Sequence, residues 1–190
     1  DPQRIYSEVE QLLTPGDLHG AHVVITAGGT REPIDAVRVI ANRSTGKQGY
    51  AIATEAVARG ANVTLISTSD LPTPYGVTLV QVETAQQMME AVNAEAKSAD
   101  VVVMAAAVAD VRPVHAAMHK LKKDPQTGLI CNLGAIELEA TPDILAGLGK
   151  SKPAGQVLVG FAAETENLIA NAQSKLERKG ADLLVANDVS

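Results

Sequence analysis

Cysteine, aromatic residues and long apolar runs are all scarce in this chain of 190 residues. The single cysteine, Cys131, excludes an internal disulfide framework and a zinc site built from several cysteines. No apolar stretch approaches the roughly 18 residues that a membrane-spanning helix needs, and the first residues lack the pattern of a signal peptide. These absences predict a cytoplasmic protein that does not act in a membrane.

The chain also lacks an excess of positive charge. The chain has 16 Lys and Arg against 22 Asp and Glu, a formal net charge of −6, and no long basic run. This balance argues against nucleic acid or an anionic membrane as the main partner. Among the histidines, His115 and His119 are spaced four apart but lack the glutamate of a zinc protease. We therefore expect no protein-built metal site.

The shortage of aromatic residues determines what fills the core. Aromatics make up 2% of the chain, with one phenylalanine, three tyrosines and no tryptophan, although 46% of the residues are hydrophobic. Alanine, valine, isoleucine and leucine must therefore form the core, and such small side chains allow helices to pack tightly on a sheet. In this background the one phenylalanine, Phe161, is conspicuous.

Short aliphatic runs alternate with amphipathic helical patterns from residue 22 onward. The runs predict strands at 22–26, 62–67, 77–82, 100–106, 156–161 and 182–186, and the helical patterns cover 46–59, 84–97 and 166–179. Strands that are apolar without alternation, separated by helices, are typical of a parallel sheet covered on both faces. The sequence therefore predicts an α/β fold: a doubly wound, mostly parallel, Rossmann-like sheet with helices on both faces.

Two segments depart from this alternation. Residues 1–20 have helical spacing that ends at Pro15-Gly16, and we expect them to be a linker or tail before a domain at 21–190. Residues 107–155 form a long insertion, with a basic cluster at 120–123, a possible strand at 129–133 and a short helix opened by Pro142. Because it follows the carboxyl end of a strand, where ligands bind in open α/β sheets, we expect this insertion to be functional.

A glycine pair follows the first predicted strand. Gly28 and Gly29 would let the backbone approach a ligand closely. The turn resembles a dinucleotide-binding fingerprint, but the G-x-G-x-x-G spacing is missing and the second strand ends in Ser67-Thr68 rather than in an acid for a ribose. The alternative is a tight turn between a strand and the next element.

A second glycine- and hydroxyl-rich turn, NRSTGKQG at 42–49, leads into a predicted helix. It is not a P-loop, because Ala41 and Gln48 stand where that motif needs Gly and Ser or Thr. Free N–H groups at a helix start favour an anion, so we expect phosphate binding here. The phosphate site would use Ser44, Gly46, Lys47 and Gly49, and Asn42 precedes it. The alternative is a Ser/Thr helix cap beside a solvated lysine.

Two further segments could contact a ligand. Met104–Asp110 leaves a strand through small residues and could form a floor with Asp110 at its edge, and Lys120 follows ten residues later. Asp110 could instead be a turn acid, and Lys120 one more exposed lysine. Lys175 and Lys179 lie four apart at the edge of a helical apolar stripe. Such like charges repel unless an anion faces them, although snorkelling lysines are the alternative.

Taken together, these segments resemble the bacterial phosphopantothenate–cysteine ligases, also called phosphopantothenoylcysteine synthetases. The matching stretches are TAGGTREPIDAVRVIANRSTGKQGYAIA (26–53), VVVMAAAVADVRP (101–113), KLKK (120–123), TPDIL (141–145), VGFAAET (159–165) and KLERKGADLLVANDV (175–189). They cover most of residues 22–189 in the same order. In bacteria this unit is usually fused behind a flavin-dependent decarboxylase, which would make residues 1–20 a remnant of the linker.

The resemblance implies a two-step ligation in coenzyme A synthesis. CTP, with Mg²⁺, would activate the carboxylate of 4′-phosphopantothenate as an acyl cytidylate and release pyrophosphate. The amine of L-cysteine would then displace CMP to form the amide. The resemblance also implies a homodimer, and FMN only in the fused decarboxylase domain. Without the resemblance, the fold alone would also suit an NAD(P)-dependent reductase or a non-catalytic nucleotide-binding domain.

The resemblance also assigns residue roles. Asn42 matches the asparagine that holds the acyl cytidylate, and Lys120 matches a lysine needed for its formation or breakdown. Nucleotide contacts are implied for Gly28, Ser44, Gly46, Lys47, Gly49, Met104, Ala105, Ala106, Asp110, Lys120, Pro142, Asp143, Ile144, Leu145, Phe161, Lys175 and Lys179, and substrate contacts for Asn42, Ala106, Ala107 and Asp110. Relatives usually continue past the ANDV segment, so we expect the domain to be truncated at its C-terminus. They also often place Pro or Glu just before the matching lysine, where this chain has Ala116–His119.

Overall fold

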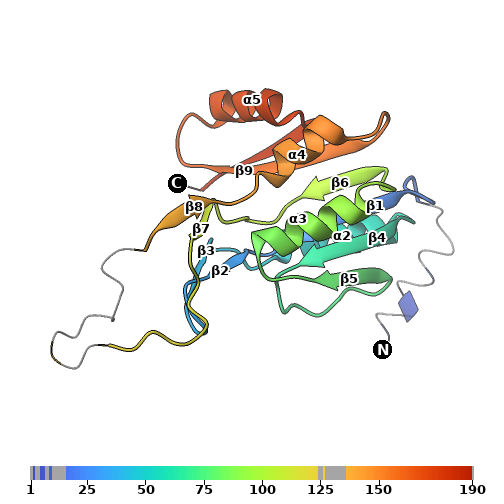
Figure 1. Ribbon diagram of the computed structural model, residues 1–190. Helices are drawn as coiled ribbons and strands as arrows, with labels where there is room; N and C mark the ends of the chain where they lie inside the picture. The colour runs from blue at the N-terminus through green and yellow to red at the C-terminus, as the bar shows by residue number, and fades with distance from the viewer. Residues whose placement is uncertain are drawn as a thin grey trace.

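The computed structural model describes residue 2, residues 5, 6 and 9, residues 16–123, residue 126 and residues 136–189 (Figure 1). The strand predicted at 129–133 and Cys131 lie outside these residues, as does most of the segment expected to be a linker.

A single parallel sheet organises the described part of the chain. Its six strands have the order β10-β9-β6-β1-β4-β5, and each neighbouring pair is parallel. The strands are β1 (His22–Ala27), β4 (Asn62–Ser67), β5 (Val77–Gln81), β6 (Val101–Met104), β9 (Val157–Glu164) and β10 (Leu183–Asp188). The chain builds outward from β1 to β5, then returns to β6 on the other side of β1 and continues to β10. This is the doubly wound order predicted from the sequence.

Helices cover both faces of the sheet, as predicted. On one face lies α2 (Lys47–Ala58), and the opposite face is covered by α3 (Ala85–Glu95) and α4 (Ile144–Ser151). The remaining helix, α5 (Leu168–Lys179), lies beside α4 and contacts β9 and β10 (Figure 1). A capping box begins α3, because Thr84 accepts from the N–H of Gln87 while the Gln87 side chain accepts from the N–H of Thr84.

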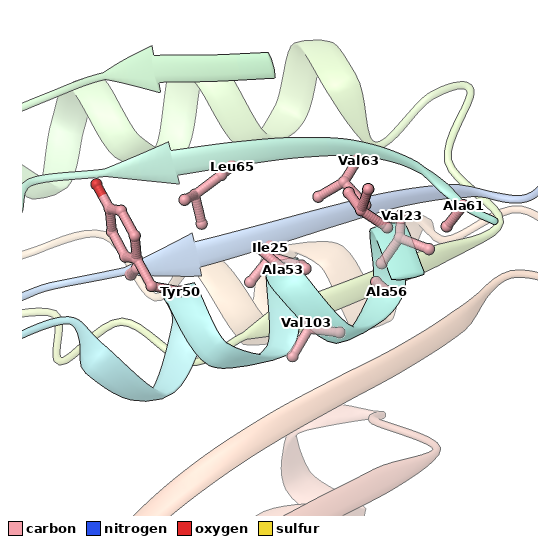
Figure 2. Packing of buried hydrophobic residues seen from close by; sticks show 11 residues of the cluster. Val23, Ile25, Tyr50, Ala53, Ala56, Ala61, Val63, Leu65 and Val103 are labelled. Atoms are coloured by element: carbon pink, nitrogen blue, oxygen red, sulfur yellow. The ribbon is translucent and has the colours of Figure 1, made fainter. Parts of the chain in front are cut away.

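Small aliphatic side chains form the core, as the composition predicts. In the cluster beneath α2, Ala53 and Ala56 lie against Val23 and Ile25 of β1 (Figure 2). Alanine brings the helix close to the sheet, since little side-chain volume separates the two backbones. Tyr50 is the aromatic member of this cluster and is 6% exposed.

Two short antiparallel ribbons extend from the sheet, and the sequence did not predict either. One pairs β2 (Arg31–Pro33) with β3 (Val39–Ala41), and the other pairs β7 (Val111–Pro113) with β8 (Leu138–Ala140). The ribbons contact one another through β2 and β7 and lie beyond the same edge of the sheet (Figure 1). The second ribbon belongs to the predicted insertion, so part of that insertion is ordered by pairing.

Candidate functional site

The predicted glycine turn and the predicted floor meet at the carboxyl edge of the sheet, between β1 and β6. At this point the connections leave in opposite directions, which opens the crevice where ligands bind in doubly wound folds. The loops after the two strands are bonded to each other across it. The N–H of Ala107 donates to the carbonyl of Gly28 at 2.8 Å, and the N–H of Thr30 donates to the carbonyl of Ala107 at 3.3 Å.

Two buried threonines hold the floor of this crevice, the segment Met104–Asp110. The hydroxyl oxygen of Thr26 accepts from the N–H of Ala106 at 3.1 Å, and that of Thr30 accepts from the N–H of Ala109 at 2.9 Å. Both threonines are 0% exposed. The floor is therefore fixed before any ligand arrives. Sequence reasoning missed both threonines, because each partner lies about 80 residues away along the chain.

Asn42 lies where β3 ends and reaches across to the floor. Its Nδ2 donates to the carbonyl of Val108 at 2.9 Å. The side chain is exposed, and no hydrogen bond to its Oδ1 occurs within the described residues. A Cβ added to Gly29 would lie 2.7 Å from the carbonyl oxygen of Asn42. The glycine turn, Asn42 and the floor are thus in direct contact, and Asn42 presents an oriented amide.

A hollow of about 400 Å³ opens at the start of α2, as the phosphate-site prediction requires. It is lined by Arg43, Ser44, Thr45, Gly46, Lys47, Gln48, Gly49 and Ala105. Gly46, the residue before α2, supplies no side-chain cap. The Thr45 hydroxyl does accept from the N–H of Lys47 at 3.5 Å, and that of Ser44 accepts from the N–H of Gly46 at 3.3 Å, so part of the Ser/Thr alternative is present. The next two N–H groups, those of Gln48 and Gly49, have no partner among the described residues, and a helix start carries the positive end of its dipole. The hollow therefore suits an anion.

Two glycines make this close arrangement possible. Gly46, the residue before α2, has a φ of 79°, a left-handed conformation that glycine adopts without strain. A Cβ on Gly46 would also lie 2.8 Å from the Cβ of Ser69. Gly49 lies in the first turn, where a Cβ would come within 2.7 Å of the carbonyl oxygen of Thr26. Gly49 therefore lets the start of α2 touch β1 directly.

The residue that follows β4 binds the glycine turn and is not free to bind a ribose. Thr68 is 1% exposed, and its hydroxyl donates to the carbonyl of Gly29 at 2.8 Å. This is the position where a dinucleotide-binding protein has its acidic residue. The observation disfavours the NAD(P)-dependent reductase alternative.

The segment around the start of α4 is attached to the floor. Some of its residues line the crevice and others pack in the core. The N–H of Thr141 donates to the carbonyl of Asp110 at 3.0 Å, which brings the half-buried Pro142 to the crevice. Ile144, however, is 5% exposed and packs in the core beneath α3 and α4, and Leu145 packs on Gly160 of β9. Their side chains stabilise the fold, so a nucleotide contact there would use the backbone. The same holds for Met104, which is 6% exposed.

Two residues predicted to bind the nucleotide form an ion pair with each other. The ammonium of Lys179 contacts Asp143, whose other oxygen accepts from the N–H of Ala146 at 3.1 Å and caps α4. Burial alone would raise the pKa of Asp143, but Lys179, the Ala146 N–H and the nearby Arg178 together hold this pKa below its usual value. The anion that faces this lysine is thus a carboxylate of the protein.

The remaining predicted residues, Phe161, Lys175 and Lys120, are less constrained. Phe161, half-buried, packs against the cluster beneath α2 and lies one residue past the Met104–Gly160 pairing of β6 and β9. Lys175 is half-buried on α5. Lys120 is exposed, and its side chain makes no hydrogen bond or ion pair with the described residues. The structure therefore places Phe161 beside the floor and leaves Lys120 unattached at its ammonium group.

The described residues offer neither a cluster of metal ligands nor a membrane-spanning helix. Among the described residues there is no cluster of three or more His, Cys, Asp or Glu side chains that could hold a metal ion. Likewise, none of the described helices has the length and apolar character needed to cross a bilayer.

Comparisons with known proteins agree on the family. The sequence model of the "DNA/pantothenate metabolism flavoprotein C-terminal domain" family matches residues 18–190. The coenzyme A biosynthesis bifunctional protein CoaBC of Mycobacterium tuberculosis (strain H37Rv) is 50% identical over 186 residues, covering 92% of this chain and 43% of that protein. The chain thus spans less than half the length of such relatives.

Solved structures give the same result. The crystal structure of the C-terminal domain of a CoaBC protein has a TM-score of 0.78 and 47% identity, and the match covers 91% of this chain and 80% of that one. Cab2 carrying H337A, in complex with phosphopantothenate-cysteine, has a TM-score of 0.75 at 21% identity, covering 98% and 77%, and shares the fold. The chain belongs to the family of DNA/pantothenate metabolism flavoprotein C-terminal domains.

Proposed function

We propose that this chain joins 4′-phosphopantothenate to L-cysteine at the expense of CTP, through an acyl cytidylate. The observation that carries the proposal is the start of α2, where Gln48 and Gly49 line a hollow beside Ala105, with Asn42 bonded to the adjacent floor. The likeness to CoaBC proteins supports the same reaction. The H337A variant of Cab2, which shares the fold, has a solved structure in complex with phosphopantothenate-cysteine.

In the first step a carboxylate oxygen of phosphopantothenate attacks the α-phosphorus of CTP. A new P–O bond forms, the bond between the α- and β-phosphates breaks, and pyrophosphate leaves. Negative charge on the phosphates would be met by the free N–H groups in the first turn of α2 and by the ammonium of Lys47. These donors belong to a rigid helix, so they need little reorganisation when the charge develops.

In the second step the neutral amine of cysteine attacks the acyl carbon. A C–N bond forms, the C–O bond to CMP breaks, and the amine loses a proton. Asn42 would hold the acyl cytidylate through its amide, which Val108 keeps in one orientation. Lys120 would bring a positive charge to the reacting phosphate, because its ammonium is free to reach a ligand. Phe161 offers a ring on which a cytosine could stack.

Mg²⁺ is part of the proposal as a companion of the nucleotide. The described residues hold no acidic cluster for it, which fits a magnesium ion bound mainly by phosphate oxygens and water. When bound, it would screen the charge of the triphosphate. The residues of this chain would then bind the magnesium nucleotide rather than the ion itself.

The two ribbons support the proposal of a homodimer. They carry exposed apolar side chains: Val37 is 64% exposed, Val39 43%, Val111 36% and Leu138 46%. Burying such side chains against a second copy is favourable. Light scattering after size-exclusion chromatography should give twice the 19.7 kDa chain mass. A monomer at micromolar concentration would contradict this. A fused FMN-binding decarboxylase domain and a cytoplasmic location belong to the same proposal, by analogy with the longer relatives.

A pyrophosphate-release assay tests the proposed reaction. With CTP and phosphopantothenate but no cysteine, the protein should release about one pyrophosphate per site, because the acyl cytidylate stays bound. Adding cysteine should give continuous turnover and amide product, and ATP should replace CTP poorly. Pyrophosphate release that does not require phosphopantothenate, or no release at all, would contradict the proposal.

A further inference from the structure

We propose that Asp35 and Arg38 are positioning residues for Lys120, because together they hold both backbone polar atoms of the next residue, Leu121. The inference rests on the proposed function and adds two residues to it. Both come from the short turn between β2 and β3. Neither residue contacts the hollow at the start of α2.

The contacts form a clamp on one residue. Oδ2 of Asp35 accepts from the N–H of Leu121 at 3.2 Å, and Nη2 of Arg38 donates to the carbonyl of Leu121 at 3.0 Å. Nη1 of Arg38 lies 3.2 Å from Oδ2 of Asp35, so the two side chains also pair with each other. A turn near the start of the domain thereby fixes a residue more than 80 positions later.

The carboxylate of Asp35 is buried and held in place by backbone N–H groups. Its side chain is 0% exposed, and its Oδ1 accepts from the N–H groups of Val37 and Arg38, each at 2.8 Å. Burial alone would raise the pKa of Asp35, but the N–H groups of Val37, Arg38 and Leu121 and the charge of Arg38 hold the pKa below its usual value. The carboxylate therefore stays ionised, and its orientation is set before it meets Leu121.

A second bond holds the same segment. The N–H of Ala117 donates to the carbonyl of Ile34 at 3.0 Å, so Lys120 lies between two points that are tied to the 34–38 turn. The peptide bond joining Lys120 to Leu121 is planar, so fixing the N–H of Leu121 also fixes the direction of the Lys120 backbone. The Lys120 side chain itself is exposed and makes no hydrogen bond or ion pair with the described residues.

The turn also connects Lys120 to Asn42. Residues 34–38 lead directly into β3, which ends at Ala41, one residue before Asn42. The two residues that the proposed reaction needs are thus attached to one ribbon, one through the chain and the other through the clamp. A misplacement of about 1 Å can cost a catalytic group roughly a hundredfold in rate, so such an attachment has a measurable consequence.

Steady-state kinetics of Asp35→Asn and of Arg38→Lys test the clamp, each alone and combined with Lys120→Gln. We expect each single variant to lower kcat about tenfold or more while the KM for CTP stays within about twofold. In the Lys120→Gln background the same substitutions should lower kcat by less than about twofold, because they act through Lys120. Equal losses in both backgrounds, or no loss in kcat, would overturn the inference.

Limited trypsin digestion gives a second measurement that needs no activity. Cleavage of the Lys120–Leu121 bond requires the clamp to open, so mass spectrometry should detect it about tenfold faster in both variants. Asp182→Asn is a matched control, since Asp182 also pairs with a cation, Lys152, and accepts from a backbone N–H, that of Leu158. It should leave both kcat and cleavage at Lys120 unchanged.

The two measurements separate the inference from the proposed function. A wild-type protein that makes no phosphopantothenoylcysteine would overturn the proposed function, and the positioning role with it. A ligating protein whose cleavage at Lys120 is unchanged in both variants would overturn the clamp alone. Faster cleavage without a loss of kcat would show a structural tie and contradict the positioning role.

Discussion

Replacing Gly46 with alanine tests whether the start of α2 is built to receive phosphate. At the φ of 79° that Gly46 adopts, an alanine costs about 1–2 kcal/mol. The added Cβ would also lie 2.8 Å from the Cβ of Ser69, and such crowding adds about 1–3 kcal/mol. Together these effects give a loss of roughly 2–5 kcal/mol, which in a domain of this size lowers the melting temperature by about 4–20 °C.

Gly155 supplies the matched control. It has a φ of 87°, but a Cβ there would meet no atom within 4 Å. Gly155→Ala should therefore show only the backbone strain, about 1–2 kcal/mol. Combining Gly46→Ala with Ser69→Gly removes the crowding and should recover the difference between the two glycine variants.

Nucleotide affinity decides the functional part of this prediction. The crowded alanine would turn the first N–H groups of α2 away from the hollow. Because a hydrogen bond to a charged group contributes about 1.5–3 kcal/mol, CTP should bind roughly 10- to 100-fold more weakly to Gly46→Ala by calorimetry below the melting temperature. Gly155→Ala should bind CTP as the wild type does. A Gly46→Ala protein that binds CTP within about twofold of wild type would refute the reasoning.

Three further predictions follow from the site. Asn42→Asp should leave the melting temperature unchanged and stop amide formation, whereas Lys120→Gln should leave it unchanged and lower amide formation strongly to a residual, measurable rate. Full activity in either variant would remove its role. Asp143→Ala removes the cap of α4, which contributes about 1 kcal/mol, and the partner of Lys179, which contributes less than about 1 kcal/mol. Urea unfolding should therefore show a free energy of unfolding lower by roughly 1–2 kcal/mol. The pKa of Asp35 is lower in the folded protein than its value near 3.8 in the unfolded chain. The ionised carboxylate therefore stabilises the fold at pH values above 3.8, and this stabilisation is lost as the pH falls through the lower pKa of the folded state. Stability should therefore fall less steeply with acid in Asp35→Asn, and an identical acid profile would contradict the assignment.

The parallel sheet could be predicted from the sequence because its strands are continuous apolar runs. Runs such as Asn62–Ser67 are buried on both faces, so the hydrophobic pattern alone identifies them. The ribbons could not be predicted in this way. Each strand in them has three residues, two contain a proline, and the apolar side chains of Val39 and Leu138 point largely to solvent. No hydrophobic period exists over so short a length.

The candidate site could be predicted only where its residues are close together in the sequence. The turn before α2 combines glycine, hydroxyl and lysine residues, and the structure gives it a helix start without a side-chain cap from Gly46. Contacts between distant segments could not be predicted. The bond from the Ala109 N–H to Thr30 and the pairing of Asp143 with Lys179 depend on the finished fold, because their partners are far apart along the chain.

A crystal structure of the protein with bound CTP tests the central claim most directly. We predict phosphate oxygens within hydrogen-bonding distance of the N–H groups of Gln48 and Gly49, with the cytosine ring against Phe161. A different hollow of similar volume, lined by Lys97 and Gln156 among others, lies away from these residues. Triphosphate bound there, with the start of α2 left free, would contradict the account.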